Sequence, residues 1–231
     1  MARFAVPFFF VISGYFWGIK VRNGEHPVYS ALKTSKRIFI VFLSWCVIYL
    51  LPYNIAEFYN YGLLGPAKYS YWNVLKQTQY PLTIFMEGTK PHLWFLISLI
   101  ISLYLSALFI HKKLIKSLIF LSILIYTVGV LAKAYSLTPI GITIHFNTRN
   151  GPFFGLLPFV VGYVMSGFTT SKKWFIYGLL IFFFGSIIHF SEIYILWKYF
   201  HTNPIHDFVF GTAFMGGGSN SFVIESPSFA K

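Results

Sequence analysis

The residues of this chain that could do chemistry stand at the ends of long apolar runs. His92 and Arg37 each open an apolar run. Arg149 precedes a third run, and Glu192 follows a fourth. Ionisable groups near membrane depth are costly, so they are functional candidates by default. Histidine titrates near neutral pH and can act as a general base. Arginine offers a planar fork of donors that suits phosphate groups or a developing negative charge.

Each of these residues also has a purely structural interpretation. A histidine or arginine at a helix end is a common interfacial anchor, and Glu192 could be an ordinary loop acid. His206 and Asp207 open a weaker apolar run, where an acid suits the N-terminal end of a helix dipole. Neither His189 nor His201 stands at i,i+4 spacing to a second histidine, which disfavours a metal site. The sequence contains no Walker loop, nucleophile elbow or zinc-protease motif.

The composition indicates that these residues belong to a membrane protein. Of the 231 residues, 56% are hydrophobic, 22% are aromatic and only 10% are charged, whereas a soluble domain carries about 25% charged residues. The net charge of +12 is spread over short clusters between apolar runs, as membrane topology predicts, which argues against a nucleic-acid partner. Cys46 is the single cysteine, so neither an internal disulfide nor a cysteine-based metal site is expected.

Six continuous apolar runs approach the roughly 20 residues that a spanning helix needs. They cover residues 4–19, 38–53, 93–110, 118–132, 152–166 and 174–190. A seventh run, 205–215, is too short to span, and no alternating pattern indicates strands. The sequence therefore predicts an all-α fold, a polytopic transmembrane helical bundle of six full spans plus a partial seventh. The bundle occupies residues 1–215, and a polar, disordered tail is expected over 216–231.

The charge of the loops predicts how the bundle is oriented. The loops after the first, third and fifth runs are basic, and the loops between them carry fewer bases per residue. The basic residues are Lys20, Arg22, Lys33, Lys36 and Arg37, then Lys112, Lys113 and Lys116, and then Lys172 and Lys173. The positive-inside rule makes these three loops cytoplasmic. Arg37 is then cytoplasmic, whereas His92 and Arg149 face outward. Arg3 also falls on the outer side, which suggests that a further helix precedes Met1.

Three sequence elements resemble the membrane acyltransferase 3 family. The family's second-helix signature looks like residues 3–16, RFAVPFFFVISGYF. A second family element is similar to residues 92–96, HLWFL, and a third resembles residues 150–156, NGPFFGL, with Arg149 just upstream as in the family. The order and spacing of the elements fit over residues 3–215. The sequence VPFFF is similar to the second helix of the branch that includes the enterobacterial common antigen O-acetyltransferase.

The resemblance implies an enzyme that moves an acyl group, commonly acetyl, to a hydroxyl of a cell-envelope sugar or polysaccharide. The donor would be acetyl-CoA or a similar acyl-CoA, used as a co-substrate, with no bound cofactor and no metal. Such enzymes are multi-pass proteins of the bacterial inner (plasma) membrane, so the lipid bilayer and the sugar acceptor are the expected partners. The family normally has a first helix with an Arg and a His, and further C-terminal helices. The chain is therefore expected to be a fragment that lacks both, including that histidine.

Within this framework the candidate residues take separate roles. His92 and Glu192 are the catalytic candidates, with Glu192 pairing with a base or orienting a hydroxyl. Arg37 suits the phosphates of the donor, and Arg149 and Arg3 suit the outward-facing side of the acceptor. Two alternatives stay open. One is a transporter or flippase, which would move a lipid-linked sugar without changing its acetyl content, and the other is an inactive truncated membrane protein.

Overall fold

The computed structural model describes residues 5–50, 55–78, 81–144, 146–168, 172–202 and 208–219. Every regular element in these ranges is a helix, which confirms the all-α prediction for them. The elements in chain order are α1 (Ala5–Arg22), α2 (Pro27–Leu50), α3 (Ile55–Tyr61), η1 (Gly62–Leu64), α4 (Gly65–Thr78), α5 (Pro81–Glu87), η2 (Pro91–Leu93), α6 (Trp94–His111), α7 (Ile115–Lys133), α8 (Pro152–Met165), α9 (Lys172–Phe200) and α10 (Phe210–Ser219).

Prolines begin several of these helices. Pro27 begins α2, Pro81 begins α5, and Pro152 begins α8. Proline suits the first helical position, because it has no N–H group to leave unsatisfied there and its φ is already helical. The apolar residues that follow supply the surface by which each helix packs on its neighbours.

Three helices in the described residues are long and apolar enough to cross a membrane: Pro91–His111, Ile115–Lys133 and Ile176–Phe200. The helix α8 is apolar but shorter. The predicted run at 38–53 contributes the second half of α2. The first half of α2 carries three basic residues, so the helix as a whole is more polar than a uniform span.

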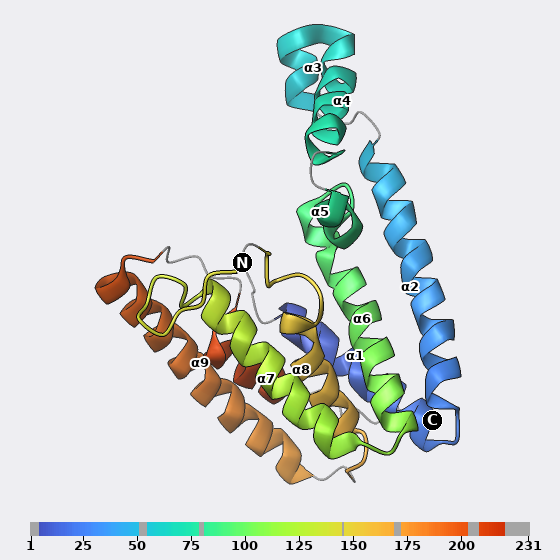
Figure 1. Ribbon diagram of the computed structural model, residues 1–231, viewed down its shortest axis with the longest axis vertical. Coiled ribbons are helices and arrows are strands. Elements are labelled where there is room, and N and C mark those ends of the chain that lie inside the picture. Colours follow the sequence, from blue (N-terminus) through green and yellow to red (C-terminus); the bar gives the residue numbers. More distant parts are fainter. Residues whose placement is uncertain are drawn as a thin grey trace.

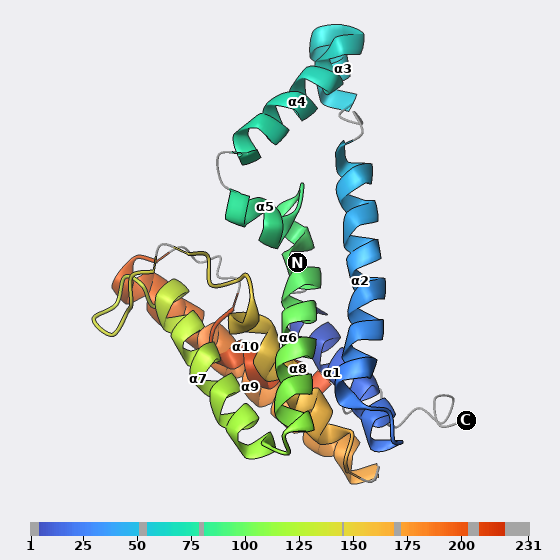
Figure 2. The same ribbon diagram turned by 45° about the vertical axis from the view of Figure 1, so that its right-hand side comes forward.

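The long helices run back and forth between two ends of the molecule (Figure 1). The turns α1–α2 and α6–α7, with the C-terminal end of α8 and the N-terminal end of α9, lie at the lower end in Figures 1 and 2. We call this the basic end, because Arg22, Lys112 and Lys113 lie there. The start of α6 and the loop between α7 and α8 lie at the opposite end. Helices α2 and α6 pack against each other, and α3 and α4 project beyond this pair.

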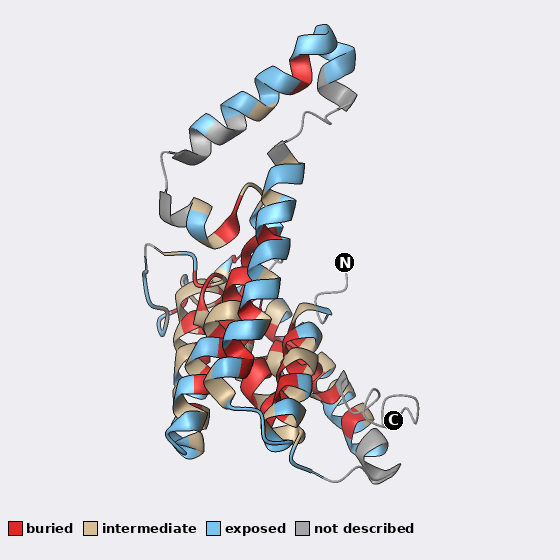
Figure 3. Cartoon of the chain, turned by 90° about the vertical axis from the view of Figure 1, so that its right-hand side faces the viewer, coloured by how far each residue is buried: buried red, intermediate tan, exposed pale blue. Residues whose placement is uncertain are grey.

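The core lies where α1, α6, α7, α8 and α10 meet. Buried residues concentrate in this part of the molecule, whereas α3 and α4 are mostly exposed (Figure 3). Helices α1 and α8 cross closely, because each offers a glycine at the crossing. A Cβ atom at Gly14 would collide with the carbonyl oxygen of Phe159, and one at Gly162 would collide with that of Val11. The crossing holds the first and third sequence elements in direct contact.

The sixth predicted run ends too early. The apolar pattern stops at residue 190 and suggests a loop over 191–204, but α9 continues to Phe200. The interior of the helix tolerates Glu192 because backbone N–H groups at the start of α10 donate hydrogen bonds to this carboxylate. The acid therefore marks a contact between two helices and does not mark a helix end.

The structure also differs from the predicted start of the tail at residue 216. Helix α10 runs on to Ser219. A Cβ atom at Gly216 would lie 2.6 Å from Pro7 Cβ, and one at Gly218 would lie 2.5 Å from the backbone nitrogen of Phe182. These glycines let α10 pack tightly on α1 and α9, so packing overrides the low helix propensity of glycine. Residues 220–231 lie outside the described part of the chain.

Candidate functional site

A buried carboxylate joins two segments at the end of the molecule opposite the basic end. Glu87 is the last residue of α5, and its Oε1 atom accepts hydrogen bonds from Asn150 Nδ2 at 2.8 Å and from Arg149 Nη2 at 3.3 Å. Asn147 Nδ2 lies 3.5 Å from the same oxygen. The Oδ1 atom of Asn147 accepts a hydrogen bond from Lys133 Nζ at 2.8 Å. We call Glu87, Asn147, Arg149 and Asn150 the carboxylate cluster. It ties α5 to the loop before α8.

The loop that carries Arg149 and Asn150 is held by its backbone. Gly151 has φ 73° and ψ −148°, a conformation that glycine adopts readily and residues with a Cβ atom do not. The carbonyl oxygen of Gly151 accepts a hydrogen bond from the hydroxyl of Ser98 on α6. Pro152 then begins α8. The sequence Asn-Gly-Pro therefore fixes the backbone between this loop and α8, and with it the positions of Arg149 and Asn150.

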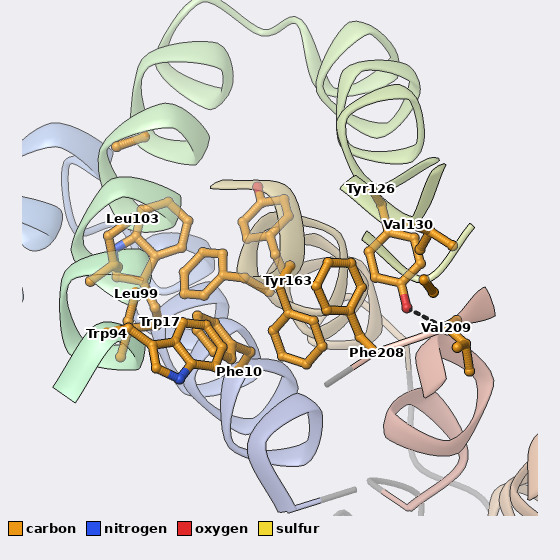
Figure 4. Close-up of a cluster of buried hydrophobic side chains, with 14 of the residues drawn as sticks. Phe10, Trp17, Trp94, Leu99, Leu103, Tyr126, Val130, Tyr163, Phe208 and Val209 are labelled. Carbon is orange, nitrogen blue, oxygen red and sulfur yellow. Dashed lines mark hydrogen bonds between the residues drawn. The ribbon is translucent and has the colours of Figure 1, made fainter. Parts of the chain in front are cut away.

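The carboxylate cluster lies beside an aromatic contact that unites the three sequence elements. The guanidinium of Arg149 lies over the ring of Trp94, 5.6 Å from its centroid, as a cation–π contact. Trp94 packs edge-on against Phe154 with ring centroids 5.4 Å apart, and it stacks on Phe10 at 6.4 Å. Phe10, Trp94 and Phe154 come from the first, second and third elements respectively. Figure 4 shows Phe10 and Trp94 together in the aromatic core.

His92 lies at the same end of the molecule, in the 3-10 turn η2 that precedes α6. Its Nε2 atom is 2.9 Å from the hydroxyl oxygen of Tyr49, near the C-terminal end of α2. The two rings meet edge-on with centroids 5.0 Å apart. Which of the two atoms donates the proton depends on the tautomer of the imidazole. Because the His92 side chain is exposed, its Nδ1 atom can face a ligand when Nε2–H donates to Tyr49.

Glu192 lies within α9 and holds the start of α10. Its two carboxylate oxygens accept hydrogen bonds from the backbone N–H groups of Phe210 and Gly211, each at 3.0 Å. These amides form the positive end of the α10 dipole, where a carboxylate is favourable. The Tyr135 hydroxyl, in the loop after α7, donates to Glu192 Oε1 at 2.7 Å. Burial raises the pKa of Tyr135, and the hydrogen bond to Glu192 and the charge of Glu192 raise it further.

The two predicted arginine sites lie apart. Arg37 is exposed in the first half of α2, which begins at the basic end, whereas Arg149 is near the opposite end. Arg3 lies outside the described residues, as do His206 and Asp207. Within the part of the chain that the structure describes, no three His, Cys, Asp or Glu side chains gather in a group that could hold a metal ion.

Glu87, Tyr49 and Tyr135 were not among the sequence-predicted site residues. Two sequence features could have identified Glu87 as a site residue: the chain has only six acidic residues, and this one stands just before the HLWFL element. No sequence feature identifies Tyr49 or Tyr135. Their roles come from contacts with His92 and Glu192, which lie 43 and 57 positions away along the chain.

Residues 1–224 match the acyltransferase 3 family, whose description is an acyltransferase domain. Neither a curated protein nor a solved structure matches the chain. The family match spans the carboxylate cluster, His92, Glu192 and the aromatic contact between the three sequence elements. The chain belongs to the acyltransferase 3 family and is an acyltransferase with helices able to cross a membrane.

Proposed function

We propose that this acyltransferase transfers an acetyl group from acetyl-CoA, or a similar acyl-CoA, to a hydroxyl of a cell-envelope sugar or polysaccharide. The observation that carries the proposal is the convergence of the three sequence elements at one end of the molecule. The exposed His92 side chain lies at this end, two residues before Trp94. The ring of Trp94 lies under the guanidinium of Arg149. Imidazole, guanidinium and carboxylate groups at one end supply the proton acceptor and hydrogen-bonding groups that transfer to a hydroxyl requires.

In the proposed reaction the sugar hydroxyl attacks the carbonyl carbon of the thioester. His92 donates Nε2–H to Tyr49 and accepts the hydroxyl proton at Nδ1. The guanidinium of Arg149 stabilises the negative charge that develops on the carbonyl oxygen. The new C–O bond forms, the C–S bond breaks, and His92 passes the proton to the departing thiolate. Glu192 acts indirectly, as a positioning residue that holds Tyr135 and the start of α10.

We further propose that α1, α2 and α8 cross the bacterial inner membrane together with α6, α7 and α9, and that α10 is a partial seventh span. The alternation of the six helices between two ends of the molecule supports this topology. The positive-inside rule then makes the basic end cytoplasmic. Arg37 serves the donor phosphates on that side. The thioester end of the donor reaches toward the outer side, where Arg149 and His92, and with them Arg3, meet the acceptor.

The experiment that tests the proposal uses membrane vesicles that contain the chain, acetyl-CoA labelled in its acetyl group, and a lipid-linked sugar acceptor. The expected result is labelled acetyl on the sugar, bound as an ester that mild alkali releases, and none in vesicles without the chain. Movement of the sugar across the vesicle membrane with unchanged acetyl content would favour the transporter alternative and overturn the proposal. The absence of both acetyl transfer and sugar movement would also contradict the proposal.

A further inference from the structure

A cavity of about 580 Å³ opens between the first half of α2 and the middle of α6. It lies on the side of the basic end and is separate from the carboxylate cluster. Its walls combine basic, aromatic and aliphatic side chains, among them Tyr29, Lys33, Lys36 and Phe39 from α2 and Ile100 and Tyr104 from α6. The cavity therefore offers positive charge beside an apolar surface.

The positive charge belongs to two neighbouring lysines. Lys33 and Lys36 are three residues apart on α2, so their side chains leave the same face of the helix. Both are exposed, and none of the described acidic residues forms an ion pair with either. The nearest acid along the chain, Glu25, already accepts a hydrogen bond from the Ser30 hydroxyl at 2.7 Å. The two amines are therefore available to an anionic ligand.

A buried hydroxyl at the same cavity points to a ligand independently of the charge. Ser35 also lines the cavity, and its side chain is only 3% exposed. Its Oγ atom has no hydrogen-bond partner among the described residues. Buried polar groups nearly always have a partner, so an orphaned hydroxyl calls for one from outside the chain. An oxygen atom of a phosphate or glycerol group would supply it.

The apolar part of the cavity continues onto a face of α2 that is suited to hydrocarbon. Leu32 and Phe39 line the cavity and are 48% and 43% exposed. Further along α2, Ile40 and Leu43 are also exposed. Lysine side chains can lie along such a surface and hold their amines at headgroup level. A small water-soluble anion would use the lysines but not the apolar wall.

We propose that this cavity binds an anionic phospholipid, with the phosphate between Lys33 and Lys36, a polar oxygen at Ser35, and an acyl chain along Leu32 and Phe39. Basic pockets between membrane helices on the cytoplasmic side are known sites for anionic headgroups. The site is distinct from the proposed acetyl-transfer chemistry. Binding of such a lipid would hold α2 against α6 and would give the helix pair a preference for membranes with acidic lipids.

The test measures retention of phosphatidylglycerol by the purified full chain, by native mass spectrometry from phosphatidylcholine nanodiscs that contain a minority of phosphatidylglycerol. The double variant Lys33→Gln/Lys36→Gln should bind this lipid roughly 30-fold more weakly, from about 1 kcal/mol for each lysine. The matched double variant Lys112→Gln/Lys116→Gln removes two exposed lysines elsewhere at the basic end, and it should bind like the wild type.

A third variant separates a defined pocket from general surface attraction. Leu32→Trp fills the cavity and keeps both lysines, and it should also reduce retention of phosphatidylglycerol. Equal weakening by the two lysine double variants would overturn the proposal, as would full retention by Leu32→Trp. Displacement of the retained lipid by acyl-CoA would also overturn it, because the cavity would then belong to the acyl donor. That result leaves the proposed acetyl transfer intact, so the two proposals fail separately.

Discussion

Two substitutions of Glu87, by alanine and by glutamine, should destabilise the chain by different amounts. Glu87→Ala removes the carboxylate that accepts hydrogen bonds from Asn150 Nδ2 and Arg149 Nη2. Asn150 is 2% exposed, so its donor has little access to water, and an unsatisfied buried donor costs about 1–3 kcal/mol. The Arg149 side chain is 20% exposed, so water partly replaces its lost partner. The effect should therefore fall below the roughly 3–5 kcal/mol of a fully buried broken pair.

We expect the free energy of unfolding to fall by about 2–3 kcal/mol in Glu87→Ala. Glu87→Gln keeps an oxygen that accepts from Asn150 and loses only the charge, so the loss should be about 1–2 kcal/mol. The assay is reversible unfolding of the purified chain in detergent micelles, followed by circular dichroism. Glu25→Gln is the control for the loss of charge. Glu25 is exposed at the basic end, and glutamine keeps an oxygen that can accept from the buried Ser30 hydroxyl, so this change should cost under about 1 kcal/mol.

Two results would refute this reasoning. The first is a Glu87→Ala variant within about 0.5 kcal/mol of the wild type, since surface substitutions have effects of that size. The second is an equal loss in Glu87→Ala and Glu87→Gln, because the retained oxygen would then make no difference. Either result would mean that the carboxylate does not hold α5 to the loop before α8.

Three further predictions follow from contacts in the structure. Gly162→Ala should destabilise the chain by at least about 1–3 kcal/mol, measured by thermal unfolding, because its Cβ would meet the α1 backbone, whereas Gly217→Ala, with open space around its Cβ, should have little effect. Tyr135→Phe should lose about 1.5–3 kcal/mol, since the hydroxyl donates to the charged Glu192. Because the pKa of Tyr135 is raised from 10.0, this contribution is fully present below that pH and is lost only as pH rises through the folded-state pKa, so the loss should be constant from neutral pH to about 9. Arg149→Lys should reduce acetyl transfer in vesicles by about 100-fold, because lysine lacks the planar fork of donors, and an unchanged rate would exclude a role for the guanidinium.

Much of the helical architecture follows from the sequence, because apolar length is a local property. The predicted apolar runs at 93–110, 118–132 and 152–166 coincide closely with α6, α7 and α8. The alternation of basic loops agrees with the basic end of the structure. The number of spans is a harder inference, because helices such as α2 combine a basic half with an apolar half.

The boundaries and partners that the sequence does not reveal depend on tertiary contacts. Glu192 looks like a loop acid in the sequence, yet it lies inside α9, where N–H groups at the start of α10 donate hydrogen bonds to its carboxylate. Gly216 and Gly218 look like a flexible tail, yet they are helical because α1 and α9 approach them closely. The hydrogen-bond partners of Glu87 lie 60 to 63 positions later in the chain. No local pattern encodes such distant pairs.

The most direct test of the central proposal compares two histidine variants in acetyl transfer. His92→Ala removes the proposed base near the carboxylate cluster, and His111→Ala removes an exposed histidine at the other end of the same helix segment. Vesicles with each variant receive labelled acetyl-CoA and a lipid-linked sugar. We predict that His92→Ala lowers the rate of ester formation by about 100-fold or more and that His111→Ala stays close to the wild type. A wild-type rate in His92→Ala would contradict the proposed mechanism.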